Sequence, residues 1–135
     1  MFVNNLHGWF SKDFQPEVNI YGIIHLSGGA IREKLFKDML RPKDLSAELE
    51  DLWEPPEIMR QCAEWRGLSD EEFYEVWNGG QGMLLVVDED KAEYVLGRAK
   101  DFNIETKIAG KITKEQKPQI TIRSKLNKNK TIIYN

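Results

Sequence analysis

Two short glycine-containing segments hold the residues of this chain whose types and spacing suit ligand binding. The first is His25-Leu26-Ser27-Gly28-Gly29, which follows an apolar run over residues 20–26. Apolar side chains at both parities of that run are typical of a strand covered on both faces. Ser27 sits where the N-cap of a following helix is expected. Because Gly28 and Gly29 have no Cβ, a ligand could lie against the main chain there. A helix start also offers free N–H groups that suit phosphate.

An ordinary structural interpretation of the same residues stays open. Short glycine motifs are weak signals on their own. A strand-to-helix turn with a hydrogen-bonded core histidine at position 25 would have the same sequence. The first segment therefore predicts either a phosphate-accepting turn with His25 beside it or a plain connection.

The second segment is Asn78-Gly79-Gly80-Gln81-Gly82, and it leads into the apolar run 84–87. Glycines at the entry of a strand indicate a bulge, or the close approach of another backbone or a ligand. Asn78 tolerates left-handed geometry and could also end the preceding helix. Two such turns could meet at one pocket and hold a phosphorylated small molecule through backbone amides.

Several other kinds of chemistry are excluded by composition and spacing. The chain has two histidines and one cysteine, which is too few for a zinc-type cluster. We find no nucleophile–base arrangement, no Walker loop and no G-x-G-x-x-G. The acidic cluster at 70–75 could suggest a metal site or an acid/base pair, but a solvated helix start explains it better, because Ser69 and Glu72 have the spacing of a capping box. The sequence therefore predicts no metal ligands.

The bulk properties favour one small intracellular domain. The 135 residues fit a single domain, and a net charge of −3 does not suit a nucleic-acid binder. The single cysteine, Cys62, fits a reducing compartment. We see neither a signal peptide nor an apolar run long enough to span a membrane, so we expect a cytoplasmic protein without a membrane partner.

The order of the predicted elements indicates an α+β fold, a mixed β-sheet packed with helices. We expect helices over 29–40, from Pro55-Pro56 to Gly67, and over 88–102, with weaker helical spacing over 3–10. Ile58, Cys62 and Trp65 should form the packed face of the second of these helices. Strands are expected near 47–49 and over 80–87, 104–112 and 118–123, and the helix between 87 and 104 should make a crossover unit of its two flanking strands. We place one domain at 1–123, followed by a basic tail at 124–135 with a possible edge strand at 131–134.

Four separated motifs together resemble a known enzyme family. They are the His25–Gly29 segment, Pro55-Pro56, Glu72-Phe73-Tyr74, and Asn78-Gly79-Gly80-Gln81-Gly82-Met83. In order and spacing, over about residues 18–112, they resemble the C-terminal domain of aminoimidazole ribonucleotide synthetases, also called phosphoribosylformylglycinamidine cyclo-ligases. The family pattern is roughly H-x-T-G-G-G, then P-P, then E-M-Y-x-x-F-N-x-G-x-G-M. This chain departs from it at Ser27, Ala30, Trp77 and Gln81.

The resemblance implies an ATP- and Mg²⁺-dependent enzyme of purine biosynthesis. In that family ATP activates the amide oxygen of formylglycinamidine ribonucleotide, a nitrogen attacks, the imidazole closes, and ADP and phosphate leave. The family's N-terminal domain, which carries most of the ATP and metal groups, is absent from this chain. The C-terminal domain helps to form the substrate cleft and packs in a homodimer. We therefore expect this chain to be inactive alone and to need an N-terminal domain, in cis or in trans.

The resemblance also assigns roles to residues of both segments. His25 would be a polar contact or proton-transfer group, and Ser27, Gly28 and Gly29 would hold the substrate phosphate. Asn78, Gly80 and Gly82 would line the cleft. Two alternatives remain open: a non-catalytic module that binds a phosphorylated ligand, and a dimerisation module whose glycines serve only tight packing. The effect of Ala30 in place of the third glycine is also open.

Overall fold

The computed structural model describes residues 2–8, 12–13, 15–127 and 130–135. These residues divide into two compact units, one made of 1–23 and 85–108 and the other of 24–84 and 109–135. The division falls within strands β1 (Ile20–His25) and β3 (Met83–Val87), which pair in a two-stranded sheet. The predicted α+β class is confirmed, because helices accompany this sheet and a second, mixed one.

The first unit is built on helices α1 (Phe2–His7) and α4 (Ala92–Asp101), with the short 3₁₀ turn η3 (Glu89–Lys91) before α4. The weak helical spacing over 3–10 thus corresponds to α1, while Trp9 and Phe10 lie outside the described residues. Among the described residues, the buried side chains that form the core of this unit are Phe2, Leu6, Val18, Val95 and Ala99. The helix predicted over 88–102 is confirmed, and its apolar spacing faces this core.

The second unit contains a four-stranded sheet in the order β4 (Lys111–Thr113), β2 (Ser46–Leu49), β5 (Ile120–Arg123) and β6 (Thr131–Tyr134). Strands β2 and β5 run parallel, whereas the two outer pairs are antiparallel. Ile120 and Ile122 on the inner strand β5 are fully buried. The edge strand predicted at 131–134 is confirmed as β6.

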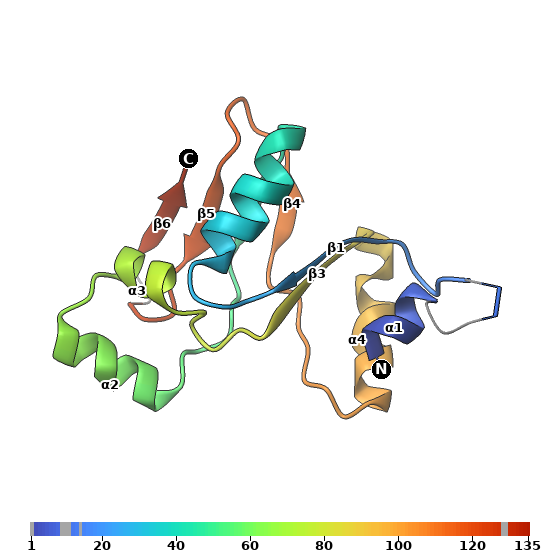
Figure 1. Ribbon diagram of the computed structural model, residues 1–135, viewed down its shortest axis with the longest axis horizontal. Coiled ribbons are helices and arrows are strands. Elements are labelled where there is room, and N and C mark those ends of the chain that lie inside the picture. The colour runs from blue at the N-terminus through green and yellow to red at the C-terminus, as the bar shows by residue number, and fades with distance from the viewer. Residues whose placement is uncertain (1, 9–11, 14, 128–129) are drawn as a thin grey trace. The chain divides into compact units, whose positions relative to one another are not determined.

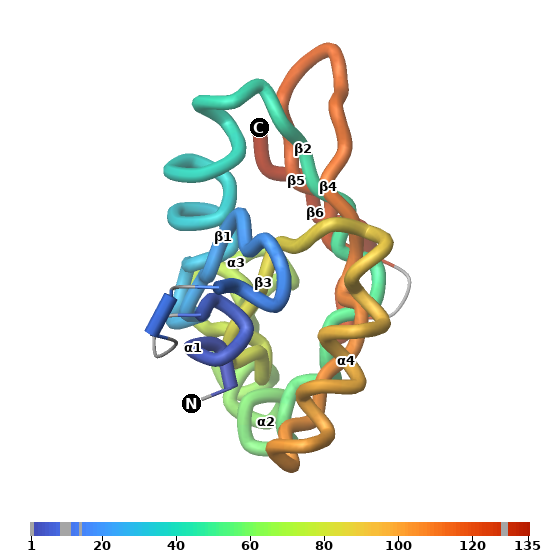
Figure 2. Tube along the Cα trace, turned by 90° about the vertical axis from the view of Figure 1, so that its right-hand side faces the viewer, coloured from blue at the N-terminus to red at the C-terminus, as the bar shows by residue number. Residues whose placement is uncertain are grey.

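Helix η1 (Ile31–Leu40), which has π-type winding, lies across one face of this sheet (Figures 1 and 2). Its buried side chains Leu35, Phe36 and Leu40 recur at helical spacing. The 3₁₀ turn η2 (Arg41–Lys43) follows, and α2 (Glu57–Arg66) and α3 (Asp70–Val76) precede the second glycine segment. The capping box of α3 is confirmed, because Ser69 and Glu72 bond each other's backbone amides.

Two topological predictions were wrong. Strands β3 and β4 belong to different sheets, so the helix between them does not make a crossover unit. The strand predicted over 104–112 is limited to 111–113. Ile104 and Ile108 instead lie in a segment without regular secondary structure, and their side chains are exposed.

Burial was mispredicted at three places. Strand β1 is not covered on both faces, because Tyr21 and Ile23 are exposed on its two-stranded sheet. The stripe of α2 predicted to pack is mostly exposed, at Ile58 and Trp65. Asp70, interpreted as solvated, is buried and accepts hydrogen bonds from the Ser124 hydroxyl and the Asn127 amide.

Candidate functional site

The first glycine turn connects β1 to η1. Ile24 and Leu26 at the end of the strand are buried, whereas His25 and Ser27 are exposed. Gly29 has φ of +71°, a left-handed conformation that favours glycine and turns the chain into the helix. The predicted polar groups of this segment therefore lie on the surface beside a helix start.

A lysine that the sequence analysis missed lies at this turn. The Lys34 Nζ atom donates to the His25 carbonyl oxygen and to Ser27 Oγ, both at 3.2 Å. Lys34 lies one to two helical turns beyond the glycines, and that spacing was the available sequence signal. The Lys34 ammonium places a positive charge at the residues predicted to contact phosphate.

The second glycine turn begins where α3 ends. The side-chain oxygen Oδ1 of Asn78 accepts from the Gly80 amide at 3.0 Å, and the Asn78 carbonyl accepts from the Gln81 amide at 3.2 Å. Gly79 and Gly80 both have positive φ, at +63° and +89°. Asn78 thus organises the turn through a local hydrogen bond of the kind that asparagine favours.

The structure brings the two glycine turns together. The Leu26 amide donates to the Gly82 carbonyl oxygen at 2.9 Å, and Asn78 Nδ2 donates to the Leu26 carbonyl oxygen at 3.2 Å. The start of η1 is joined to α3 by the ion pair of Arg32 with Glu75. The sequence suggested that the two turns could meet, and these long-range hydrogen bonds show that they do.

The glycines differ in what surrounds them. A Cβ on Gly28 would lie 2.2 Å from the Val76 carbonyl oxygen, and one on Gly80 would lie 2.9 Å from Pro56 Cδ. Gly82 has no atom within 4 Å of the position of a Cβ. Close packing therefore accounts for Gly28 and Gly80, whereas the backbone at Gly82 is open to an approaching group.

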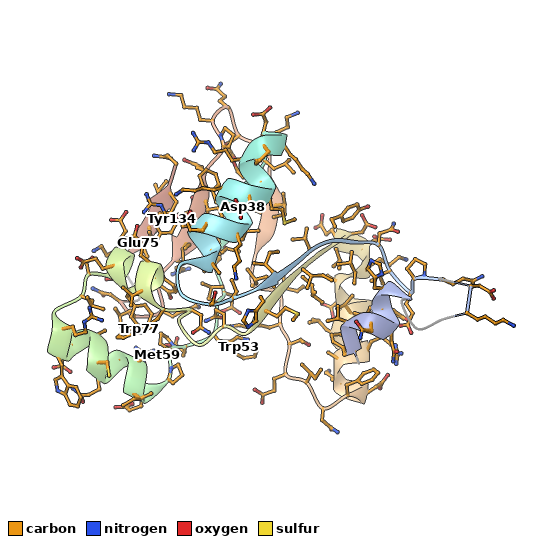
Figure 3. All side chains as sticks on the ribbon, viewed as in Figure 1. Asp38, Trp53, Met59, Glu75, Trp77 and Tyr134 are labelled. Atoms are coloured by element: carbon orange, nitrogen blue, oxygen red, sulfur yellow. The ribbon has the colours of Figure 1, made fainter. Side chains whose placement is uncertain are left out.

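Gln81 is a second residue that the sequence analysis did not assign. Its side chain is 4% exposed, and its amide bonds both the N–H of Trp53, at 2.8 Å, and the carbonyl of Trp53, at 3.0 Å. It also donates to the Gly79 carbonyl at 2.7 Å. Figure 3 labels Trp53 on the loop that precedes α2. Gln81 thus joins that loop to the second turn, and its departure from the family pattern was the available sequence signal.

A buried tyrosine borders the Arg32–Glu75 ion pair. The Arg32 guanidinium lies 5.4 Å from the centroid of the Tyr134 ring. Burial, followed by the carboxylates of Glu75 and Glu71, raises the pKa of Tyr134 to about 12. Tyr134 therefore stays protonated near neutral pH, and its hydroxyl donates to the Glu71 carbonyl oxygen. This cluster is held by charge and packing and gives the turns a fixed support.

The described residues offer little to a metal ion. Among them, no group of three or more histidine, cysteine, aspartate or glutamate side chains could hold one. The same part of the chain contains no helix long and apolar enough to cross a bilayer. The chemistry that the site itself can supply is thus polar contact through His25, Ser27, Lys34 and open backbone groups.

A comparison with known protein families covers most of this chain. The family model described as AIR synthase related protein, C-terminal domain, matches residues 12–123. The chain belongs to this family. The matched region contains both glycine turns and the helices between them.

Curated relatives carry the same name in three organisms. A phosphoribosylformylglycinamidine cyclo-ligase of Methanobrevibacter smithii is 31% identical over 82% of this chain and 30% of its own length. That of Syntrophotalea carbinolica is 33% identical over 82% of this chain and 31% of its own length. That of Oceanobacillus iheyensis is 30% identical over 84% of this chain and 34% of its own length. The chain therefore spans about a third of the length of these relatives.

Proposed function

We propose that this chain supplies the substrate half of a phosphoribosylformylglycinamidine cyclo-ligase. The observation that carries the proposal is the pairing of the two glycine turns, through Leu26 with Gly82 and Asn78 with Leu26. The family match covers both turns. The reaction, the nucleotide and the N-terminal domain partner are inferred for this chain from the family and from the names of its relatives.

The first turn would hold the phosphate of the ribonucleotide. Ser27 Oγ and the Lys34 ammonium lie at hydrogen-bond distance from each other on the surface. Gly28 is exposed and Gly29 is half-buried just ahead of η1, and N–H groups at a helix start favour an anion. His25, exposed at the end of β1, would contact the substrate or move a proton.

The second turn would line the same cleft. Asn78 and Gly80 fix its shape, and the backbone at Gly82 is open. ATP and Mg²⁺ would activate the amide oxygen in the complete enzyme. As the family resemblance implies, we assign both mainly to the family's N-terminal domain, outside the region matched here. We propose a soluble cytoplasmic enzyme that works as a homodimer and is inactive without that domain.

Thermal unfolding with two ligands tests this proposal. Formylglycinamidine ribonucleotide should raise the melting temperature of the chain, whereas ATP should not, because a ligand stabilises only the state that binds it. Ser27→Ala should weaken the substrate effect without altering the unliganded melting temperature. A Gly29 substitution would test the phosphate role less directly, because φ of +71° would strain the backbone of any residue with a side chain and so also lower the stability of the unliganded chain. A rise with ATP alone would contradict the assignment of the two halves.

The dimerisation or packing module remains a second candidate function. It is favoured by Gly28 and Gly80, whose lack of a side chain is accounted for by Val76 and Pro56. This candidate predicts a dimer whose melting temperature responds to neither ligand, even after the N-terminal domain of a relative is added. A non-catalytic binding module would respond to the ribonucleotide but give no ring closure.

A further inference from the structure

Helix α2 presents an apolar stripe to solvent. The stripe consists of Ile58, Cys62 and Trp65, which share one helix face at i, i+4 and i+7. Ile58 is 65% exposed and Trp65 is 74% exposed, whereas Cys62 is half-buried. Such spacing is the pattern of a helix that buries this face against a neighbour. Among the described residues, no such neighbour covers this face, which we call the α2 stripe.

The helix does not depend on the stripe for its shape. Ala63 is buried on the other side, and Gly67 ends the helix by donating to the Ala63 and Glu64 carbonyl oxygens. At the N-terminal end, Arg60 Nε donates to the Pro55 carbonyl oxygen at 3.1 Å. These contacts form α2 locally and leave its largest apolar side chains outward. Figure 1 shows α2 at the margin of its unit, away from the four-stranded sheet.

The borders of the stripe carry opposite charges. Helical geometry places Glu57 and Glu64 along one side of it and Arg66 along the other, and all three are exposed. An apolar centre with a charged rim is the composition of a protein–protein contact, and tryptophan is enriched at such centres. A complementary surface would be apolar, with a basic side chain facing the two glutamates and an acidic side chain facing Arg66.

The size of the stripe decides its occupant. A ten-residue helix is about 15 Å long. A stable complex of separate proteins buries about 800 Å² on each partner, which is more than one such stripe supplies. A contact this small is maintained when other links hold the two surfaces at high effective concentration. The relatives supply this situation, because the matched region is 30% of the M. smithii protein and the remainder belongs to the same polypeptide.

We propose that the α2 stripe is the docking surface for the remaining part of the cyclo-ligase, the part that lies outside the region matched here. The inference rests on the proposed function, since it takes the chain to work with that part. It adds the face of contact, which neither the family match nor the names of the relatives assign.

Side-chain footprinting by hydroxyl radicals tests the surface. The chain alone is compared with a fusion in which the residues of the M. smithii enzyme that precede its matched region are placed ahead of this chain. Oxidation of Trp65 and Ile58 should be at least fivefold slower in the fusion. Ile133 on β6, which is 50% exposed, is the matched control and should be unchanged. Equal reactivity of Trp65 in the two proteins would overturn the proposal.

Two further outcomes separate this proposal from others. Protection of Trp65 and Ile58 that rises with concentration in the chain alone, and that is lost at Ile58 in the Trp65→Ser variant, would assign the stripe to a second copy and overturn the proposal. Ring closure by the fusion with Trp65 still reactive would retain the function and reject the surface. Protection without ring closure would support the surface and contradict the function.

Discussion

Asn78 Nδ2 donates to the main-chain oxygen of Leu26, so one side-chain amide joins two turns that lie 52 residues apart in the sequence. The other end of the same amide accepts from Gly80 N–H. One residue therefore both shapes the second turn and fixes its distance from the first. The proposed site depends on this residue before any ligand is present.

Replacing Asn78 separates these two effects. Asn78→Ala removes both hydrogen bonds and should lower the free energy of unfolding by about 1–3 kcal/mol, because partly buried partners are left without a replacement. Asn78→Asp retains the acceptor for Gly80 but loses the donor to Leu26, and should fall between Asn78→Ala and the wild type. Urea denaturation at pH 7 measures the free energies. An alanine variant as stable as the wild type would show that the link between the turns is incidental.

The glycines of the two turns should respond in opposite ways to alanine. Gly28→Ala places a Cβ 2.2 Å from the Val76 carbonyl oxygen, so the turns must separate and the melting temperature should fall steeply. Gly82→Ala meets no atom within 4 Å and should melt close to the wild type. Differential scanning calorimetry gives both values. If Gly82→Ala retains stability but weakens the response to formylglycinamidine ribonucleotide, the open backbone faces the ligand; an unchanged response removes that role.

How much of this could be predicted depended on the range of the interactions. The capping box of Ser69 and Glu72 and helix α4 follow from residues a few positions apart, so local chemistry was sufficient. Strand β2 was also predicted, near 47–49, although the residues around it are mostly polar and acidic. The order of the strands in the sheet was not predicted. The parallel pairing of Ala47 with Ile120 joins residues 73 positions apart, and the apolar spacing of a strand carries no information about which strand it pairs with.

The burial of side chains was harder to predict than secondary structure, because it also depends on residues far apart in the sequence. The acids at 70–75 look alike in sequence, yet Asp70 is buried because Ser124 and Asn127 reach it from a distant loop. The spacing of Ile58 and Trp65 correctly predicted a helix with an apolar face. It could not show that the described chain leaves this face open.

The capping carboxylate of α3 should give a pH-dependent stability. The backbone N–H of Ser69, and then its hydroxyl, lower the pKa of Glu72 from its ordinary value. Because the folded pKa is the lower one, the stabilisation is present above the unfolded pKa of about 4.3 and is lost as pH falls through the folded pKa. Glu72→Gln keeps an acceptor but not the charge near the helix start. The stability gap between wild type and variant should therefore be largest near pH 7 and close at acidic pH.

Thermal unfolding across pH 2.5–7 checks this gap, with Glu71→Gln as the control. That substitution removes an equal charge from the same first turn without the bonds to Ser69. A gap that is constant with pH, or one that is equal in the two variants, would contradict the assignment to the cap.

Gln81 offers the sharpest test of the support beneath the site. Gln81→Leu fills a similar volume but leaves the Trp53 amide and the carbonyls of Trp53 and Gly79 without this partner, so the free energy of unfolding should fall by about 1–3 kcal/mol.

Gln81→Glu retains an acceptor for the Trp53 amide but turns its second oxygen toward two carbonyls. The protonated acid can donate to one of them, which should raise the folded pKa of the new carboxyl above its unfolded value. Its stability relative to wild type should then be greatest below the unfolded pKa and decline as pH rises through the folded pKa, the opposite direction from Glu72. Urea denaturation at pH 4 and pH 7 distinguishes the two cases, and a Gln81→Glu deficit that does not grow with pH would show that the amide nitrogen of Gln81 is not needed to hold the Trp53 loop against the second turn.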